Sequence, residues 1–187
     1  MTILTDADGV IENLTAEMPA LINEKYGTDV AFEDITQWDF AKAFPELTHE
    51  QIYSTELEAE LYDRIKPMRA APEILKRLMD DGHRVYVVTN TPYKAVALKM
   101  EKVMKKYFPF LTWENFIITS NKQMIKGDVL IDDGIHNLLG GEYVKLLYDA
   151  PCNRSFDAEA NGMIRVRSWE EIYRVISGMN GPKKTDP

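Results

Sequence analysis

The sequence predicts an α/β fold with a doubly wound parallel sheet and a small helical cap inserted after the first strand. Short, continuous apolar runs recur along the chain and alternate with segments of helical periodicity. Such runs are typical of strands covered on both faces, and their alternation with helices favours a parallel sheet. A stretch of some 55 residues after the first run contains no convincing strand.

Six strands are expected, and glycine and serine mark the ends of several helices. The strands are predicted at residues 2–6, 83–90, 115–120, 128–133, 144–149 and 162–168. Helices are predicted over residues 71–82, 91–108 and 168–178. The last of these has Ser168 as its N-cap, Glu171 three residues on, and Gly178 as a stop.

The strand-free segment predicts a separate cap. We assign residues 13–65 to a helical cap and residues 1–12 with 66–181 to the α/β core. Residues 182–187 are polar and are expected to form a disordered tail. An insertion that follows the first strand directly should lie over the carboxyl edge of the sheet.

Composition indicates a globular protein with a small ligand. Of the 187 residues 45% are hydrophobic, and the net charge is −8. Residues 12–66 hold 13 acidic and 4 basic side chains, which disfavours a nucleic-acid polymer as partner. Residues 89–127 hold 7 basic and 2 acidic side chains, which suits a small anion. These features are compatible with a homodimer.

The apolar runs and the cysteine content indicate where in the cell the protein is located. No run approaches the roughly 18–20 residues that span a bilayer, and no signal peptide is expected. Cys152 is the single cysteine, which favours a reducing cytoplasm. We therefore expect a cytoplasmic protein without a membrane partner.

Polar residues follow four of the predicted strands. Asp6 and Asp8 follow the first, Thr89 and Asn90 end the second, Lys122 lies just beyond the third, and Asp132 and Asp133 end the fourth. Carboxyl ends of parallel strands meet at one edge, where ligands bind. Clustered carboxylates need a cation, and oxygen ligands beside a phosphate favour Mg²⁺. A lysine there would hold a phosphoryl group.

This ordered set resembles the motifs of the haloacid dehalogenase superfamily of phosphotransferases. The matching stretches are "TDADGV", "VVTNT", Lys122 and "LIDDG". Within the superfamily, the sequence is most similar to the 5'(3')-deoxyribonucleotidase family, through "KQMIKGDVLIDD", "YDAPCNR" and the tryptophan of "RSWEEI". The resemblance covers nearly the whole chain.

The resemblance implies roles for individual residues. Asp6 would be the nucleophile that forms an aspartyl-phosphate, and Asp8 the general acid and base. The metal would be held by Asp6, by the carbonyl of Asp8 and by Asp133, with Asp132 beside them. Thr89, Asn90 and Lys122 would hold the phosphoryl group.

Two parts of the substrate site stay less defined. A further lysine should reach the phosphate; Lys102 matches best, with Lys94 and Lys99 as alternatives. In the cap, Leu14 and Trp38, with Phe40 and Tyr62, could form an apolar pocket for a nucleobase. Such an aromatic cluster is more often part of a hydrophobic core.

The function expected is a Mg²⁺-dependent phosphomonoesterase that cleaves deoxy- or ribonucleoside monophosphates. A superfamily phosphatase for another small ester, such as a sugar phosphate, is the nearest alternative. A non-catalytic phosphate-binding or metal-binding protein on the same fold is an alternative of another class. A signalling receiver domain also uses clustered aspartates, but its acceptor follows a later strand and it lacks the insertion.

Overall fold

The computed structural model describes residues 1–179 and contains a six-stranded parallel sheet. Its strands lie in the order β3-β2-β1-β4-β5-β6, with every neighbouring pair parallel. Their bounds are β1 Thr2–Thr5, β2 Arg84–Thr89, β3 Phe116–Ile118, β4 Val129–Asp132, β5 Val144–Tyr148 and β6 Met163–Val166. All six lie within the predicted ranges, and the predicted fold class is confirmed.

The sheet is covered on both faces because apolar residues alternate sides along each strand. Ile3 and Val87 belong to the larger core, which helices α4 (Ala71–Asp80) and α8 (Trp169–Met179) help to bury. Leu4 and Leu130 belong to a smaller core on the other side, with Leu138 of the short helix α7 (Ile135–Leu138). This packing brings the central strands β1 and β4 side by side, so that their ends share one site.

The helical stretch predicted over residues 91–108 is interrupted. It consists of α5 (Tyr93–Lys99), a π-helical turn (η4, Met100–Met104) and α6 (Lys105–Tyr107). A π turn holds one more residue than an α turn, so it changes which side chains share a face. This local change decides which lysine enters the site.

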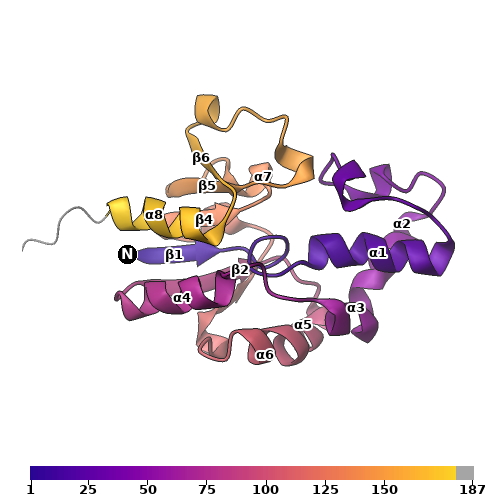
Figure 1. Cartoon of the computed structure of the whole chain (residues 1–187), viewed down its shortest axis with the longest axis horizontal. Coiled ribbons are helices and arrows are strands. Elements are labelled where there is room, and N and C mark those ends of the chain that lie inside the picture. Colours follow the sequence, from indigo (N-terminus) through magenta and orange to yellow (C-terminus); the bar gives the residue numbers. More distant parts are fainter. Residues whose placement is uncertain (180–187) are drawn as a thin grey trace, which may run out of the picture.

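The strand-free segment forms α1 (Leu14–Tyr26), α2 (His49–Tyr53) and α3 (Ala59–Arg64), with short 3₁₀ turns between them. Figure 1 shows these helices beyond the carboxyl end of β1, at the end of the molecule opposite the N-terminus. The two ends of the segment are joined, because Asn13 N–H donates to the Lys66 carbonyl and Lys66 N–H to Asn13 Oδ1. These bonds hold the first and last residues of the segment next to each other.

Two further sequence predictions concern membrane-spanning segments and the C-terminal tail. Within residues 1–179, no helix has both the length and the apolar character needed to cross a membrane. The predicted tail, residues 182–187, lies outside the described residues, as do the last two residues assigned to the core.

Candidate active site

The loop after β1 holds its two aspartates through its own backbone. Asp6 N–H donates to the Ile131 carbonyl of β4, and the N–H groups of residues 10–12 converge on the Ala7 carbonyl. Gly9 adopts a φ of +76°, and a Cβ there would lie 2.7 Å from Asp133 Oδ2. Glycine is therefore required both by the turn and by its close approach to β4.

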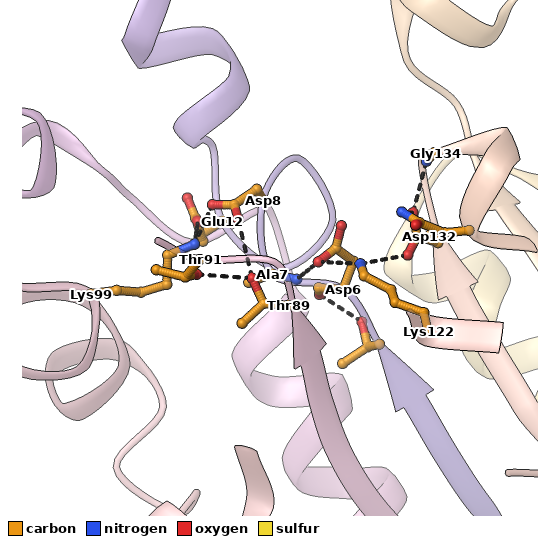
Figure 2. Close-up of polar contacts among 12 residues, drawn as sticks. Asp6, Ala7, Asp8, Glu12, Thr89, Thr91, Lys99, Lys122, Asp132 and Gly134 are labelled. Atoms are coloured by element: carbon orange, nitrogen blue, oxygen red, sulfur yellow. Dashed lines mark hydrogen bonds and ion pairs between the residues drawn. The ribbon is translucent and has the colours of Figure 1, made fainter. Parts of the chain in front are cut away.

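Lys122 joins the ends of β1 and β4 (Figure 2). Its Nζ lies 2.8 Å from Asp6 Oδ1 and 2.7 Å from Asp132 Oδ2, and the side chain is 1% exposed. Burial raises the pKa of Asp6 to about 7, against the lowering effect of Lys122 and with a further increase from Asp132. Asp6 and Asp132 thus share the single ammonium group of Lys122. The negative charge of Asp6 is therefore only partly neutralised.

Asp132 and Asp133 are adjacent in sequence but differ in their hydrogen bonding. Asp132 accepts hydrogen bonds from Lys122, Gly134 N–H and Asn137, so its oxygens are occupied. Asp133 is buried, and its Oδ1 has no hydrogen-bond partner within residues 1–179. Burial, followed by the charge of Asp132, raises the pKa of Asp133 well above its usual range.

These carboxylates fit a divalent cation. One oxygen each from Asp6, Asp132 and Asp133 lies within 4.8 Å of the other two. An unpartnered buried oxygen is costly unless a proton or a cation satisfies it. An all-oxygen ligand set suits Mg²⁺, and the residues present therefore fit the expected metal.

A second ion-pair cluster surrounds Asp8 (Figure 2). Lys99 forms an ion pair with Asp8, and Thr89 Oγ1 donates to Asp8 Oδ2 at 3.3 Å. Burial would raise the pKa of Asp8, but the ammonium group of Lys99 lowers it to about 2. Lys99 also lies 3.5 Å from Glu12 Oε1, so one buried lysine faces two carboxylates.

A cavity of about 510 Å³ opens over this edge of the sheet. Asp6, Asp8, Lys122 and Asp133 line it from the sheet side, together with Asn90. Apolar and aromatic side chains line it from the helical segment: Leu14, Met18, Phe32, Ile35, Trp38 and Phe40. Polar side chains of the same segment line it as well: Thr15, Gln37, Asp39, His49, Tyr53 and Glu56. The volume is within the range of small-molecule sites, and a wall of mixed polarity with a charged floor suits an ester that has one anionic end.

Most of the predicted site residues meet in this region. Asp6, Asp8, Asn90, Lys122 and Asp133 reach the cavity, as do Leu14 and Trp38. Thr89 and Asp132 lie behind it as hydrogen-bonding partners of Asp8 and Lys122. Tyr62 is instead a fully buried core residue, so the expected aromatic pocket does not include it.

The prediction that Lys102 is the additional lysine of the site is corrected. Lys102 pairs with Asp63 of α3 on the exposed surface, whereas Lys99 contacts Asp8 and is 3% exposed. The π turn after Lys99 rotates Lys102 out of the face it would share with Lys99 in a regular helix. The amino-acid sequence contains no pattern that indicates this π turn.

Two carboxylates near the site were missed. Glu12 is fully buried, and Glu56 of the helical segment lines the cavity. Burial, with a further increase from Asp8, raises the pKa of Glu56 to about 7. The signal available for Glu12 was an acidic residue inside the otherwise apolar run "GVIENL". Glu56 lies in a strongly acidic segment and had no such signal.

The chain is similar to known proteins over nearly its whole length. The family profile described as "5' nucleotidase, deoxy (Pyrimidine), cytosolic type C protein" matches residues 1–180. A 5'(3')-deoxyribonucleotidase of Bacillus subtilis is 36% identical over 93% of this chain and 97% of its own. A Clostridium acetobutylicum protein of the same description is 29% identical over 95% and 96%.

A solved structure shares the fold. A haloacid dehalogenase family hydrolase from Deinococcus radiodurans, described with bound phosphate and sodium, has a TM-score of 0.65. It is 13% identical in sequence and covers 96% of both chains. The sheet and its catalytic edge therefore define a hydrolase of the haloacid dehalogenase type that acts on phosphoric monoesters. Within that class, the chain belongs to the family described as 5' nucleotidase, deoxy (pyrimidine), cytosolic type C.

Proposed function

We propose that this protein is a Mg²⁺-dependent phosphatase of nucleoside monophosphates, preferentially deoxy, that works through an aspartyl-phosphate. The observation that carries the proposal is the floor of the cavity. There, Asp6 and Asp8 lie beside Lys122 and the unpartnered oxygen of Asp133. The names of the relatives support a nucleotide as substrate.

Asp6 is the nucleophile in this proposal. Its carboxylate is held by Lys122 and by Ala7 N–H at 2.7 Å, which fixes its direction toward the cavity. Attack on phosphorus forms the acyl phosphate and breaks the bond to the ester oxygen. Lys122, with Asn90 at the rim of the cavity, binds the phosphoryl oxygens.

Asp8 transfers the proton. It protonates the departing ester oxygen and then removes a proton from the water that hydrolyses the acyl phosphate. In the present arrangement the pKa of Asp8 is low because Lys99 is paired with it. A phosphate dianion in the cavity adds negative charge beside Asp8, which raises the proton affinity of Asp8.

Asp6, Asp133 and the Asp8 carbonyl would hold Mg²⁺, with Asp132 orienting Lys122 beside them. When bound, the ion supplies positive charge to the phosphoryl oxygens in the transition state. The apolar wall of the cavity would receive the base and the sugar. Where its apolar side chains face the sugar, a 2'-hydroxyl would be left unpaired, which would favour deoxyribose by ~1–3 kcal/mol. The single cysteine supports a cytoplasmic location.

A substrate screen tests this proposal. Deoxy- and ribonucleoside 5'- and 3'-monophosphates, sugar phosphates and p-nitrophenyl phosphate would be assayed for phosphate release with Mg²⁺ and with chelator. We expect Mg²⁺-dependent hydrolysis, fastest with a deoxynucleotide. Faster release from a sugar phosphate than from every nucleotide would refute the substrate; activity that survives full chelation would refute the metal.

Asp6→Asn tests the nucleophile. The amide cannot form an acyl phosphate, so we expect the rate to fall by several powers of ten. The fold should persist, because an amide is isosteric with the carboxyl group. Asp29→Asn, on the exposed surface of the helical segment, is the matched control. If Asp6→Asn retained a tenth of the wild-type rate, Asp6 would not be the nucleophile.

A further inference from the structure

We infer that Glu56 is a specificity residue for the sugar: its carboxyl group accepts a hydrogen bond from the 3'-hydroxyl of a nucleoside 5'-monophosphate. Glu56 belongs to the turn η3 (Ser54–Leu57) of the helical segment and lines the cavity. The inference rests on the proposed function and deepens it, because it assigns a partner to the part of the substrate between the phosphate and the base.

Glu56 carries a free carboxyl group on the wall of the cavity. Asp39, the other acidic residue that the helical segment contributes to this wall, accepts hydrogen bonds from Tyr53 Oη at 2.9 Å and from Ala41 N–H at 3.0 Å. The carboxyl oxygens of Glu56 have neither a hydrogen-bond nor an ion-pair partner within residues 1–179. An acceptor removed from water without a partner is unfavourable, and a donor group of the substrate would satisfy it.

The backbone holds Glu56 in this position. Tyr62 Oη donates to the Glu56 carbonyl at 3.0 Å, and Tyr62 is 1% exposed. Glu58 N–H donates to the carbonyl of the fully buried Thr55 at 3.2 Å, which closes the turn around Glu56. The carboxyl group therefore starts from a fixed turn, as a residue that reads the position of a substrate group requires.

Glu56 lies on the side of the cavity where the ester oxygen leaves. The turn η3 packs against α5, which ends at Lys99, and Asp8 and Lys99 are the charges that act on Glu56. Because Asp8 is the proposed proton donor to the ester oxygen, Glu56 lies near the sugar atoms that follow that oxygen.

The base is assigned to a different part of the wall. Trp38 contacts His136 of α7, which follows β4, whereas Glu56 lies toward α5, which follows β2. The strands β2 and β4 flank β1 on opposite sides. Trp38 and Glu56 therefore belong to opposite sides of the site, which suits a base at the first and a sugar hydroxyl at the second.

A hydroxyl group fits this position better than a charged group. A carboxyl group offers an acceptor oxygen whether or not it is ionised, so the contact does not depend on the charge of Glu56. A second phosphate group there would lack a cation, because Lys99 is already paired with Asp8. The 3'-hydroxyl is the hydroxyl group that the sugar of a 2'-deoxynucleoside 5'-monophosphate carries.

The test compares thymidine 5'-monophosphate with its 3'-deoxy analogue, which lacks only that hydroxyl group. For the wild-type protein, kcat/KM should be about tenfold to a hundredfold higher with thymidine 5'-monophosphate, because the analogue leaves Glu56 unpaired. Glu56→Met has a similar length but no oxygen, and it should bring the ratio of the two values to within about twofold of one. Glu56→Gln keeps an acceptor oxygen and should keep most of the wild-type ratio.

The ratio of two substrates on one protein is the readout because a general loss of active protein cancels in it. Glu46→Met is the matched control: it makes the same change on the exposed surface of the helical segment, away from the cavity lining. This variant should show the wild-type ratio.

The outcomes separate this inference from the proposed function. A wild-type ratio below about twofold would overturn the inference without any variant, so the test holds even if Glu56→Met does not fold. A folded Glu56→Met protein with the wild-type ratio would overturn it as well. Both results leave the proposed function in place, since nucleotides are still cleaved. Phosphate release from aryl or sugar phosphates but from no nucleotide would refute the proposed substrate and this inference together.

Discussion

At the scale of single residues, the site is a balance of buried charges. Five carboxyl groups and two ammonium groups lie in two linked clusters: Asp6, Asp8, Glu12, Asp132 and Asp133 with Lys99 and Lys122. Breaking a buried pair by removing one partner typically costs about 3–5 kcal/mol, so these residues constrain one another. Within residues 1–179, Glu12 Oε1 and Asp133 Oδ1 are the buried side-chain oxygens without a hydrogen-bond partner. Glu12 Oε1 lies 3.5 Å from Lys99 Nζ, whereas Asp133 lies in the carboxylate cluster, so we propose the cation at Asp133.

Gly9 is a residue-scale prediction with an internal control. Gly9→Ala should destabilise the protein by roughly 1–2 kcal/mol for its positive φ, and its Cβ should also displace Asp133. Gly27 has a similar φ of +69° but no atom within 4 Å of a Cβ, so Gly27→Ala should cost only the backbone strain. Urea unfolding and Mg²⁺ titration of activity distinguish the two. Unchanged Mg²⁺ affinity in Gly9→Ala would contradict the contact.

At the scale of elements, short loops after the strands place the charged groups, and the inserted helices provide the opposite wall. Trp38 is 47% exposed and contacts His136 edge-to-face, with the ring centroids 4.7 Å apart. It therefore bridges the inserted segment and helix α7 at the cavity. We propose that Trp38 contacts the base of the substrate, because it lines the cavity and is not a core residue.

Trp38→Ala tests that element-scale role. Stacking on a base is worth ~1–3 kcal/mol, so kcat/KM for the best nucleotide should fall about fivefold to a hundredfold. The value for p-nitrophenyl phosphate should fall much less, because that ester lacks a base. Trp113→Ala is the control; Trp113 is 62% exposed and precedes edge strand β3. Equal losses with both substrates would argue against a base-binding role.

At the scale of the whole molecule, the charge asymmetry has a structural consequence. The acidic segment 13–65 is tied to the rest of the protein by Lys102 with Asp63 and by Arg154 with Glu33. Exposed pairs of this kind contribute little to stability, about 0–1 kcal/mol each. We therefore expect binding of a cation at the carboxylate cluster to change the stability of the chain more than these ion pairs do.

This predicts a pH dependence of stability. The pKa of Asp6 rises from 3.8 to about 7 on folding, so between these values the folded state binds more protons than the unfolded state. Stability contributed at this group therefore decreases as pH rises through that window, and it stays low above it. Mg²⁺ reverses the loss because it needs ionised carboxylates.

Thermal unfolding at pH 5 and pH 8, with chelator and with Mg²⁺, measures this effect. We expect Mg²⁺ to raise Tm more at pH 8 than at pH 5. Asp133→Asn should lose most of the Mg²⁺ effect, while Asp29→Asn, on the exposed surface, should retain it. An equal rise at both pH values would contradict the proton linkage.

Local sequence determined the sheet and most of the charged residues in the cavity. Apolar runs specify buried strands, and parallel strands bring their carboxyl ends together, so Asp6, Asp8, Lys122 and Asp133 were predictable as one group. Gly9 belongs to the same motif, and its positive φ follows from the tight turn after β1. These features depend on contacts within a few residues or on the regular geometry of a sheet.

Tertiary structure decided the rest. Lys99 replaces Lys102 because a π turn, which packs against α3, changes the facing residue of the helix. Tyr62 became core and Trp38 a cavity wall because burial depends on the packing of the inserted helices, which periodicity in short segments does not encode. Glu12 lies beside Lys99, 87 positions away in the sequence, because backbone hydrogen bonds close the loop that carries Glu12. Sequence spacing encodes regular elements; it does not encode which charges meet when those elements pack.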